Sequence, residues 1–489
     1  MDNLLLQNKK KSGARRIFGN AVSILTSDVS NRVSTFITYA LVARFLGVLE
    51  FGQMALGFTF FHSFQLLSVA GLKSLIIREV SKDRNKTELY LINASFVVFV
   101  TSILSITCLR LFAWIMGYSP ETTSIIMILS IGLIPFSLSI ICDALFQARE
   151  QMYHITFTNL IVNLVKLALL CLLLLKGASL YHVIILFIFA YTLALIIKLY
   201  FLLRLINRVG ERFNLKFCLA MAKSSSTFMG INGVNAAMTS FNVILLSKYR
   251  GEAEVGLLSA ASQLMVPVAL MFESIIVSVY PAVCRSFEHS IHKLKLISER
   301  VLEVIVSIVL PSAIALFFLA GTLLVMLYGK KDFMQAGDVL QIIVWGLVLR
   351  AVAKVFGMVL IASMKERKTL RILTIDLLAL VIFGFILVSR YGLIGSAITM
   401  LLVRIVDFVQ HYISVSRIFS SLTLMRLFWI QIVAASGMTI CFLLMRGYNP
   451  ITTTLLASII YISILFAVMI FSLGGTNQFK ARYMDLKPE

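Results

Sequence analysis

The sequence predicts an all-α integral membrane protein with about 14 transmembrane helices. Of its 489 residues, 59% are hydrophobic and 14% are charged, and the mean hydropathy is +0.94. A soluble domain typically has about a quarter charged residues. Apolar stretches long enough to cross a bilayer as helices recur about every thirty residues along the chain. These observations together leave a polytopic membrane protein as the class that fits.

The fourteen predicted spans are joined by short connections. The segment 321–329 is expected to be a short interfacial helix, and the junction at 389–391 is the least distinct boundary between spans. The spans are expected at 18–43, 52–77, 90–115, 122–146, 154–175, 180–203, 219–247, 256–283, 300–320, 337–363, 370–389, 391–416, 425–446 and 450–473.

Lys and Arg are unevenly distributed between the two sides of these spans. With the N-terminus in the cytoplasm, 27 of the 44 basic residues fall on the cytoplasmic side and 8 on the opposite side. Because cytoplasmic loops are enriched in basic residues, both termini are expected in the cytoplasm. The same rule explains most of the net charge of +21, so nucleic acid is not an expected partner.

The sequence lacks the common signatures of catalytic and metal centres. Its six cysteines show no metal-ligand spacing, and it contains no GxxxxGK[ST] phosphate-binding loop. It also shows no paired catalytic carboxylates, no nucleophile–histidine set, and no connection longer than about twenty residues. We therefore expect no cofactor, no metal and no enzymatic activity.

Charged residues inside the predicted spans are the main clue to function. Each costs about 2.5–3.5 kcal/mol at a helix centre, so such residues normally face a wet interior. Basic residues outnumber acidic ones by nine to five, which suits an anionic substrate. The basic residues are Arg32, Lys73, Arg110, Lys166, Lys198, Lys223, Arg350, Lys354 and Arg404, and the acidic ones are Asp28, Asp143, Glu273, Asp376 and Asp407.

Two pairs of these charges have helical i, i+4 spacing. Asp28 and Arg32 share a face of the first span. Either Arg32 contacts the anion and Asp28 sets its position, or the two neutralise each other where the span packs against a neighbouring helix. Arg350 and Lys354 are both positive, so a bound anion or a carboxylate such as Glu273 is expected to compensate them. Alternatively, Lys354 snorkels toward the cytoplasm.

Amide side chains form stripes on two spans. Asn159, Asn163 and Lys166 share one face of the fifth span, and Asn232 and Asn235 begin a similar stripe on the seventh. Amides can donate to and accept from sugar hydroxyls. They also hold helices together in lipid, and this alternative is at least as good for the fifth span.

The remaining intramembrane charges have less specific patterns. Arg404, Asp407 and His411 share one face of the twelfth span, as a proton relay or, preferably, as a structural ion pair with a histidine. Six charges lie within a few residues of span ends, and most of these six are interpreted as snorkelling: Lys73, Arg110, Lys198, Lys223, Asp143 and Asp376. Pro267 is expected to kink the eighth span.

A short internal repeat links the two halves of the chain. ARFLGVLEFGQMAL (43–56) aligns with SKYRGEAEVGLLSA (247–260) at an offset of 204 residues, which pairs Gly47 with Gly251 and Gly52 with Gly256. Chance recurrence of a glycine turn is the alternative, but parallel repeats are typical of transporters. The predicted organisation is a cytoplasmic arm (1–17), an N-lobe of six spans (18–203), a linker (204–218), a C-lobe of six spans (219–416), two appended spans (425–473) and a cytoplasmic tail (474–489).

The runs ARFLGVLEFGQMALGFTFF (43–61) and GLKSLIIREVSK (71–82) resemble the opening of bacterial oligosaccharide flippases of the polysaccharide biosynthesis (Wzx-type) family. That family belongs to the multidrug/oligosaccharidyl-lipid/polysaccharide exporter superfamily. The resemblance implies two six-helix lobes in a V shape and a cavity lined by spans 1, 2, 7 and 8. Lys73 therefore stays among the candidate cavity residues.

The resemblance also implies a function. The protein would move an undecaprenyl-diphosphate-linked glycan from the cytoplasmic to the outer leaflet of the bacterial inner membrane, beside membrane lipid, a polysaccharide polymerase and a chain-length regulator. Because no ATP site is expected, an ion gradient would drive transport, with Asp28 or Glu273 as the coupling group.

Two other functions are considered. A cation-coupled drug or metabolite exporter of the same architecture would favour an acidic or aromatic cavity, which the basic surplus disfavours. A membrane-embedded enzyme acting on lipid-linked glycans is disfavoured by the short connections and the missing catalytic groups.

Overall fold

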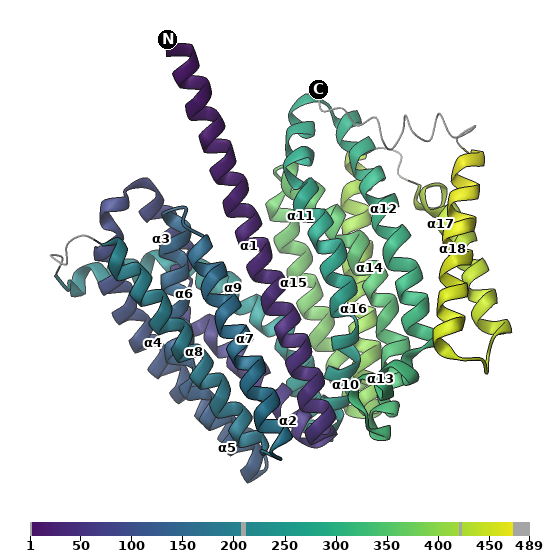
Figure 1. Cartoon of the computed structure of the whole chain (residues 1–489), viewed down its shortest axis with the longest axis horizontal. Helices are drawn as coiled ribbons and strands as arrows, with labels where there is room; N and C mark the ends of the chain where they lie inside the picture. Colours follow the sequence, from purple (N-terminus) through teal and green to yellow (C-terminus); the bar gives the residue numbers. More distant parts are fainter. Residues whose placement is uncertain (1, 207–211, 420–422, 473–489) are drawn as a thin grey trace. The chain divides into compact units, whose positions relative to one another are not determined.

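The computed structural model describes residues 2–206, 212–419 and 423–472 (Figure 1). Side chains are described throughout these ranges except at 2–18, 21, 226–228, 230–232, 235, 288–289 and 366. The described residues form helices and no strand, which confirms the predicted all-α membrane fold. The chain divides into two compact units, Met1–Ser259 and Ala260–Glu489, and each is considered by itself.

The first unit consists of long helices that pack side by side. Helix α1 packs mainly against α7, α2 packs against α4 and α9, and α8 packs against α6 and α7. Its elements are α1 (Asp2–Leu46), α2 (Val48–Val69), α3 (Leu72–Lys82), η1 (Arg84–Lys86), α4 (Thr87–Met116), α5 (Pro120–Ile131), α6 (Leu133–Ala148), α7 (Tyr153–Leu175), α8 (Leu180–Leu205), α9 (Leu215–Arg250) and the first part of α10 (Glu252–Leu264).

The second unit contains the end of α10 and the remaining helices. Helix α14 packs against α12 and α16, while α17 and α18 pack against each other. The elements are α11 (Val266–His289), α12 (Ile291–Phe318), α13 (Ala320–Tyr328), η2 (Lys331–Gln335), α14 (Ala336–Ala362), α15 (Glu366–Phe383), η3 (Gly384–Val388), α16 (Ser389–Phe419), α17 (Leu424–Leu444) and α18 (Pro450–Ser472).

Each of the fourteen predicted spans is mainly helical where the structure describes it. By length and composition, 10 helical segments of the described chain can cross a membrane, or 11 if the bent pair α2 and α3 is one span. One segment, Arg367–Phe419, contains two predicted spans, and its backbone leaves the helical conformation at Gly392 (φ 55°). Helices α1 and α9 are outside this set.

Several spans are interrupted rather than continuous. Between α2 and α3, Ala70 and Gly71 both adopt left-handed conformations and the axis bends by 41°. The expected kink at Pro267 is a break, because α10 ends at Leu264 and α11 begins at Val266. Proline is compatible with the first turn of the new helix, where its missing N–H has no helical acceptor.

The glycines of the internal repeat have matching backbone conformations. Gly47, which precedes α2, has φ 103° and ψ −174°. Gly251, which precedes α10, has φ 83° and ψ −177°. These are conformations that residues with a Cβ rarely adopt. The two turns are therefore built in the same way, as the offset of 204 residues predicts.

The repeat also brings two helix starts into direct contact. A Cβ atom at Gly52 would overlap the backbone carbonyl of Glu252, and a Cβ atom at Gly256 would overlap that of Val48. Val48 and Glu252 are themselves 204 residues apart, so the contact is reciprocal. Small residues allow backbones to approach this closely in membrane proteins.

Gly52→Ala is expected to destabilise the protein, because the added methyl group meets backbone that cannot move alone. Overpacking typically costs about 1–3 kcal/mol. The thermal midpoint of the purified chain in detergent should fall. Gly233→Ala is the matched control, since a Cβ atom there meets nothing within 4 Å. Equal midpoints for the two variants would contradict the close contact.

Candidate functional site

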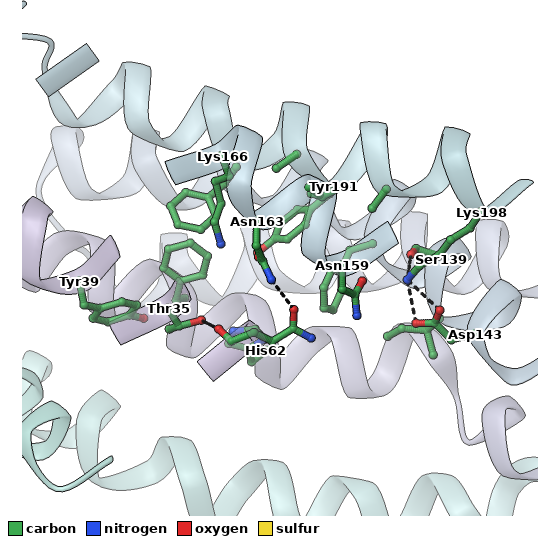
Figure 2. A pocket seen from close by; sticks show the side chains of 18 residues that line it. Thr35, Tyr39, His62, Ser139, Asp143, Asn159, Asn163, Lys166, Tyr191 and Lys198 are labelled. Atoms are coloured by element: carbon green, nitrogen blue, oxygen red, sulfur yellow. Dashed lines mark hydrogen bonds and ion pairs between the residues drawn. The ribbon is translucent and has the colours of Figure 1, made fainter. Parts of the chain in front are cut away.

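A polar cavity of about 320 Å³ lies within the first unit, between α1, α2, α6, α7 and α8 (Figure 2). Figure 2 shows Lys166 and the Lys198–Asp143 pair toward opposite ends of this cavity, with Asn159 and Asn163 between them. Its size is at the lower end of small-molecule sites. The polar lining residues are Asn31, Thr35, Tyr39, His62, Ser139, Asp143, Asn159, Asn163, Lys166, Tyr191 and Lys198.

The amide stripe of α7 both lines the cavity and holds helices together, so it fits the two alternatives that the sequence leaves open. Asn159 donates to Ser27 Oγ at 2.7 Å, and Asn163 donates to Asn31 Oδ1 at 2.8 Å. These hydrogen bonds join α7 to α1, and both amides also line the cavity. The polar surface of the cavity is therefore fixed in place by the packing of the two helices.

Lys166 is the least compensated charge of this cavity. Its side chain is buried, with 9% of the residue exposed, and Nζ lies 5.3 Å from the ring centroid of Phe187. Among the described residues, no carboxylate forms an ion pair with it. A buried cation with only an aromatic face beside it would be strongly stabilised by binding of an anion.

Lys198 is fully compensated, which corrects its interpretation as a snorkelling residue. Its Nζ lies 2.8 Å from Asp143 Oδ1 and 2.9 Å from Ser139 Oγ. The side chains of Lys198 and Asp143 are only 4% and 18% exposed. Both residues lie near span ends, but they point inward because each satisfies the charge of the other.

Aromatic rings form the remaining walls. The rings of Phe58 and Phe187 are 4.6 Å apart, and those of Phe136 and Tyr191 are 4.7 Å apart. His62 stacks on Phe58 at 6.0 Å. These residues are not distinctive in the sequence, because aromatic residues are common in apolar spans. His62 is the exception, since it is an isolated histidine in an apolar span.

The second unit contains a smaller cavity, of about 270 Å³, lined by Arg350 and Arg404. Arg350 Nη2 lies 2.6 Å from Glu273 Oε1, so the expected ion pair between α14 and α11 is present. Lys354, one turn further along α14, is exposed and within electrostatic reach of the same group of charges. The cavity therefore has two guanidinium groups at its wall, and one of them is paired with an acid.

The other candidate residues are placed differently. The side chains of Asp28, Arg32 and Lys73 are exposed, and none of them lines either cavity. Asn31 and Thr35, which lie on the same helix as Asp28 and Arg32, do line the first cavity. Asn232 and Asn235 lie on α9, but their side chains are outside the described part of the chain. Substrate binding by all the candidate residues stays a prediction.

The fold and the two polar cavities define a multi-pass helical membrane protein of the transporter type. The sequence matches the family described as polysaccharide biosynthesis protein over residues 17–287, more than half of the chain. The chain therefore belongs to this family, as the resemblance of residues 43–61 and 71–82 predicts.

One curated protein and two solved structures are similar to the chain. The capsular polysaccharide biosynthesis protein CapF of Staphylococcus aureus is 28% identical over 178 residues, which cover 36% of this chain and 44% of CapF. The fold is similar to that of the lipid II flippase MurJ in its inward closed conformation, with a TM-score of 0.71, 17% identity and coverage of 95% and 99% of the two chains. It is also similar to an inward-facing multidrug resistance MATE family transporter of the MOP superfamily, with a TM-score of 0.63, 14% identity and coverage of 82% and 100%.

Lys198→Met is expected to destabilise the first unit, because it leaves the Asp143 carboxylate buried without a cation. Breaking a buried pair costs about 3–5 kcal/mol. Thermal unfolding should show a marked loss for this variant. The double variant Lys198→Met with Asp143→Leu should recover most of that loss, and a double variant as unstable as the single one would contradict the pairing.

Proposed function

We propose that this chain is a flippase that moves polyprenyl-diphosphate-linked oligosaccharides from the cytoplasmic to the outer leaflet of a bacterial inner membrane. Family membership and the fold similarity to MurJ support a role in handling lipid-linked glycans. The observation that carries the proposal is Lys166, a buried ammonium in a polar cavity without an acidic partner among the described residues. It offers a site for one phosphate of the diphosphate.

The rest of the cavity suits the sugars next to that phosphate. Asn159 and Asn163 each offer donors and acceptors for hydroxyl groups. Aromatic rings such as Phe187 and Tyr191 give flat apolar surfaces against which a sugar ring can pack. A cavity of about 320 Å³ holds the diphosphate region and not a long oligosaccharide, so the prenyl chain stays in lipid and the distal sugars extend outward.

The predicted topology supports loading from the cytoplasm. Lys166 lies near the middle of the span 154–175, whereas Asp143 and Lys198 lie near the ends of spans 122–146 and 180–203. The positive-inside rule predicts those two ends on the cytoplasmic side. The cavity would then run from mid-membrane toward the cytoplasmic leaflet.

Transport of this kind needs no chemical step. Alternating access would expose the diphosphate site first to one leaflet and then to the other. Arg350 and Arg404 line the cavity of the second unit and would bind an anion there, and Arg32, Lys73, Lys354, Asn232 and Asn235 stay proposed contributors. A polysaccharide polymerase and a chain-length regulator would use the product on the outer face. A drug exporter for organic cations fits less well, since an unpaired Lys166 would repel such cargo.

The leaflet distribution of lipid-linked oligosaccharide tests this proposal. Cells without the chain should accumulate it on the cytoplasmic face, and the intact chain should relieve the accumulation. Lys166→Met should lower the flipping rate about ten- to a hundred-fold, because a charge-assisted hydrogen bond contributes about 1.5–3 kcal/mol. Lys166→Arg should keep part of the activity.

Lys176→Met is the matched control, since Lys176 is exposed at the end of the same helix. An unchanged distribution in cells without the chain, in a strain with no redundant flippase, would contradict the proposed function. Full activity of Lys166→Met would contradict the role of this cavity.

A further inference from the structure

A group of ionisable side chains in the second unit is not used by either cavity. Asp376 on α15 is 2% exposed and accepts a hydrogen bond from Gln410 Nε2 at 3.0 Å. On α16, Asp407 Oδ1 lies 2.9 Å from His411 Nδ1. The position of Asp376 near a span end predicts a snorkelling residue, but its side chain is buried in the helix packing and accepts a hydrogen bond from Gln410.

Asp376 is a buried carboxyl group whose hydrogen-bond partner is the neutral amide of Gln410. Among the described residues no basic side chain forms an ion pair with it, and Asp407 of the neighbouring helix α16 belongs to the same group of charges. Burial without a cation disfavours the ionised form of a carboxyl group, and a second carboxylate nearby disfavours it further. The site therefore favours a proton on Asp376.

Helix α14 is shaped to admit the polar side chains of α16. A Cβ atom at Gly357 would come 3.4 Å from His411 Nε2, and one at Gly346 would come 3.3 Å from Arg404 Cγ. The two glycines leave room for the imidazole and for the stem of the guanidinium. The packing of α14 against α16 thus leaves space for the polar side chains of this cluster.

We propose that Asp376, Asp407 and His411 form a proton-binding site that is linked to anion binding through Arg404. Arg404 lines the cavity of the second unit, and its Nη1 lies 4.0 Å from Asp407 Oδ2. An anion that engages Arg404 withdraws this cation from Asp407 and adds negative charge nearby. Both effects favour proton uptake by the carboxyl pair.

The other charged groups near the site do not replace Arg404 in this role. From α14, Arg350 and Lys354 face the same region, and Arg350 is paired with Glu273 of α11. Within the described chain, neither α12 nor η3 brings a charged group that acts on Asp376, Asp407 or His411. Protonation should raise the affinity for the anion, and anion binding should raise the affinity for the proton. Because linkage is reciprocal, both affinities should rise by the same factor.

Infrared spectroscopy of the purified full chain in detergent tests the proton site without any substrate. At neutral pH the spectrum should contain the carbonyl band of a protonated, buried carboxylic acid. Asp376→Asn should remove the band, while its Oδ1 can still accept from Gln410. Asp407→Asn should remove it as well, which covers the case in which the first variant is unstable. Glu273→Gln is the control and should leave it unchanged.

A spectrum without this band, or a band that survives both Asp variants, would overturn the proton site. A band that disappears on addition of Na⁺ at constant pH would also overturn it in favour of a cation site.

The link to anion binding is tested with geranylgeranyl diphosphate as the probe. The linkage to transport rests on the proposed function, whereas the infrared result does not. Intact protein should take up protons when the probe binds in weak buffer, and Asp376→Asn should bind the probe without this uptake. Equal uptake by both proteins would overturn the linkage. If the intact protein does not bind the probe, the proposed function fails and the infrared result still decides the proton site.

Discussion

The cost of charge in lipid is the constraint on which the structure depends. A lysine or aspartate at the centre of a span is tolerated only if it has a partner or faces a polar space. The described chain uses both solutions. Lys198 pairs with Asp143 and Arg350 pairs with Glu273, whereas Lys166 lies in a cavity with an aromatic ring beside it. The uncompensated group marks the place where an anion would be stabilised most.

The helix packing is arranged to keep these polar groups inside. Amides of α7 bond to α1 at the wall of the first cavity, so the surface that can contact a sugar is also a surface that holds the unit together. Glycines make room where backbone or polar side chains come close, at Gly52 and Gly256 in the first unit and at Gly346 and Gly357 in the second. The contacts that hold the helices together thus also shape the cavities that the proposed transport would use.

Sequence patterns predict what local spacing controls. Hydropathy predicts the helices, and the offset of 204 residues predicts the matched turns at Gly47 and Gly251. The like charges of Arg350 and Lys354 predict a compensating anion or a carboxylate such as Glu273, and the structure has the Arg350–Glu273 pair. The pairing of Lys198 with Asp143 could not be predicted, because the residues are far apart in sequence and both lie near span ends. The burial of Asp376 was missed for the same reason, since it depends on the neighbouring helix α16 and not on the residues around Asp376.

The most direct test of the account is a comparison of two lipids that differ only in the head group. Binding of a polyprenyl diphosphate and of the matching polyprenyl alcohol to the purified chain can be measured by native mass spectrometry. If the cavity of the first unit is an anion site built around Lys166, the diphosphate binds and the alcohol does not, and Lys166→Met removes the difference. Equal binding of the two lipids to the intact protein would contradict the central claim.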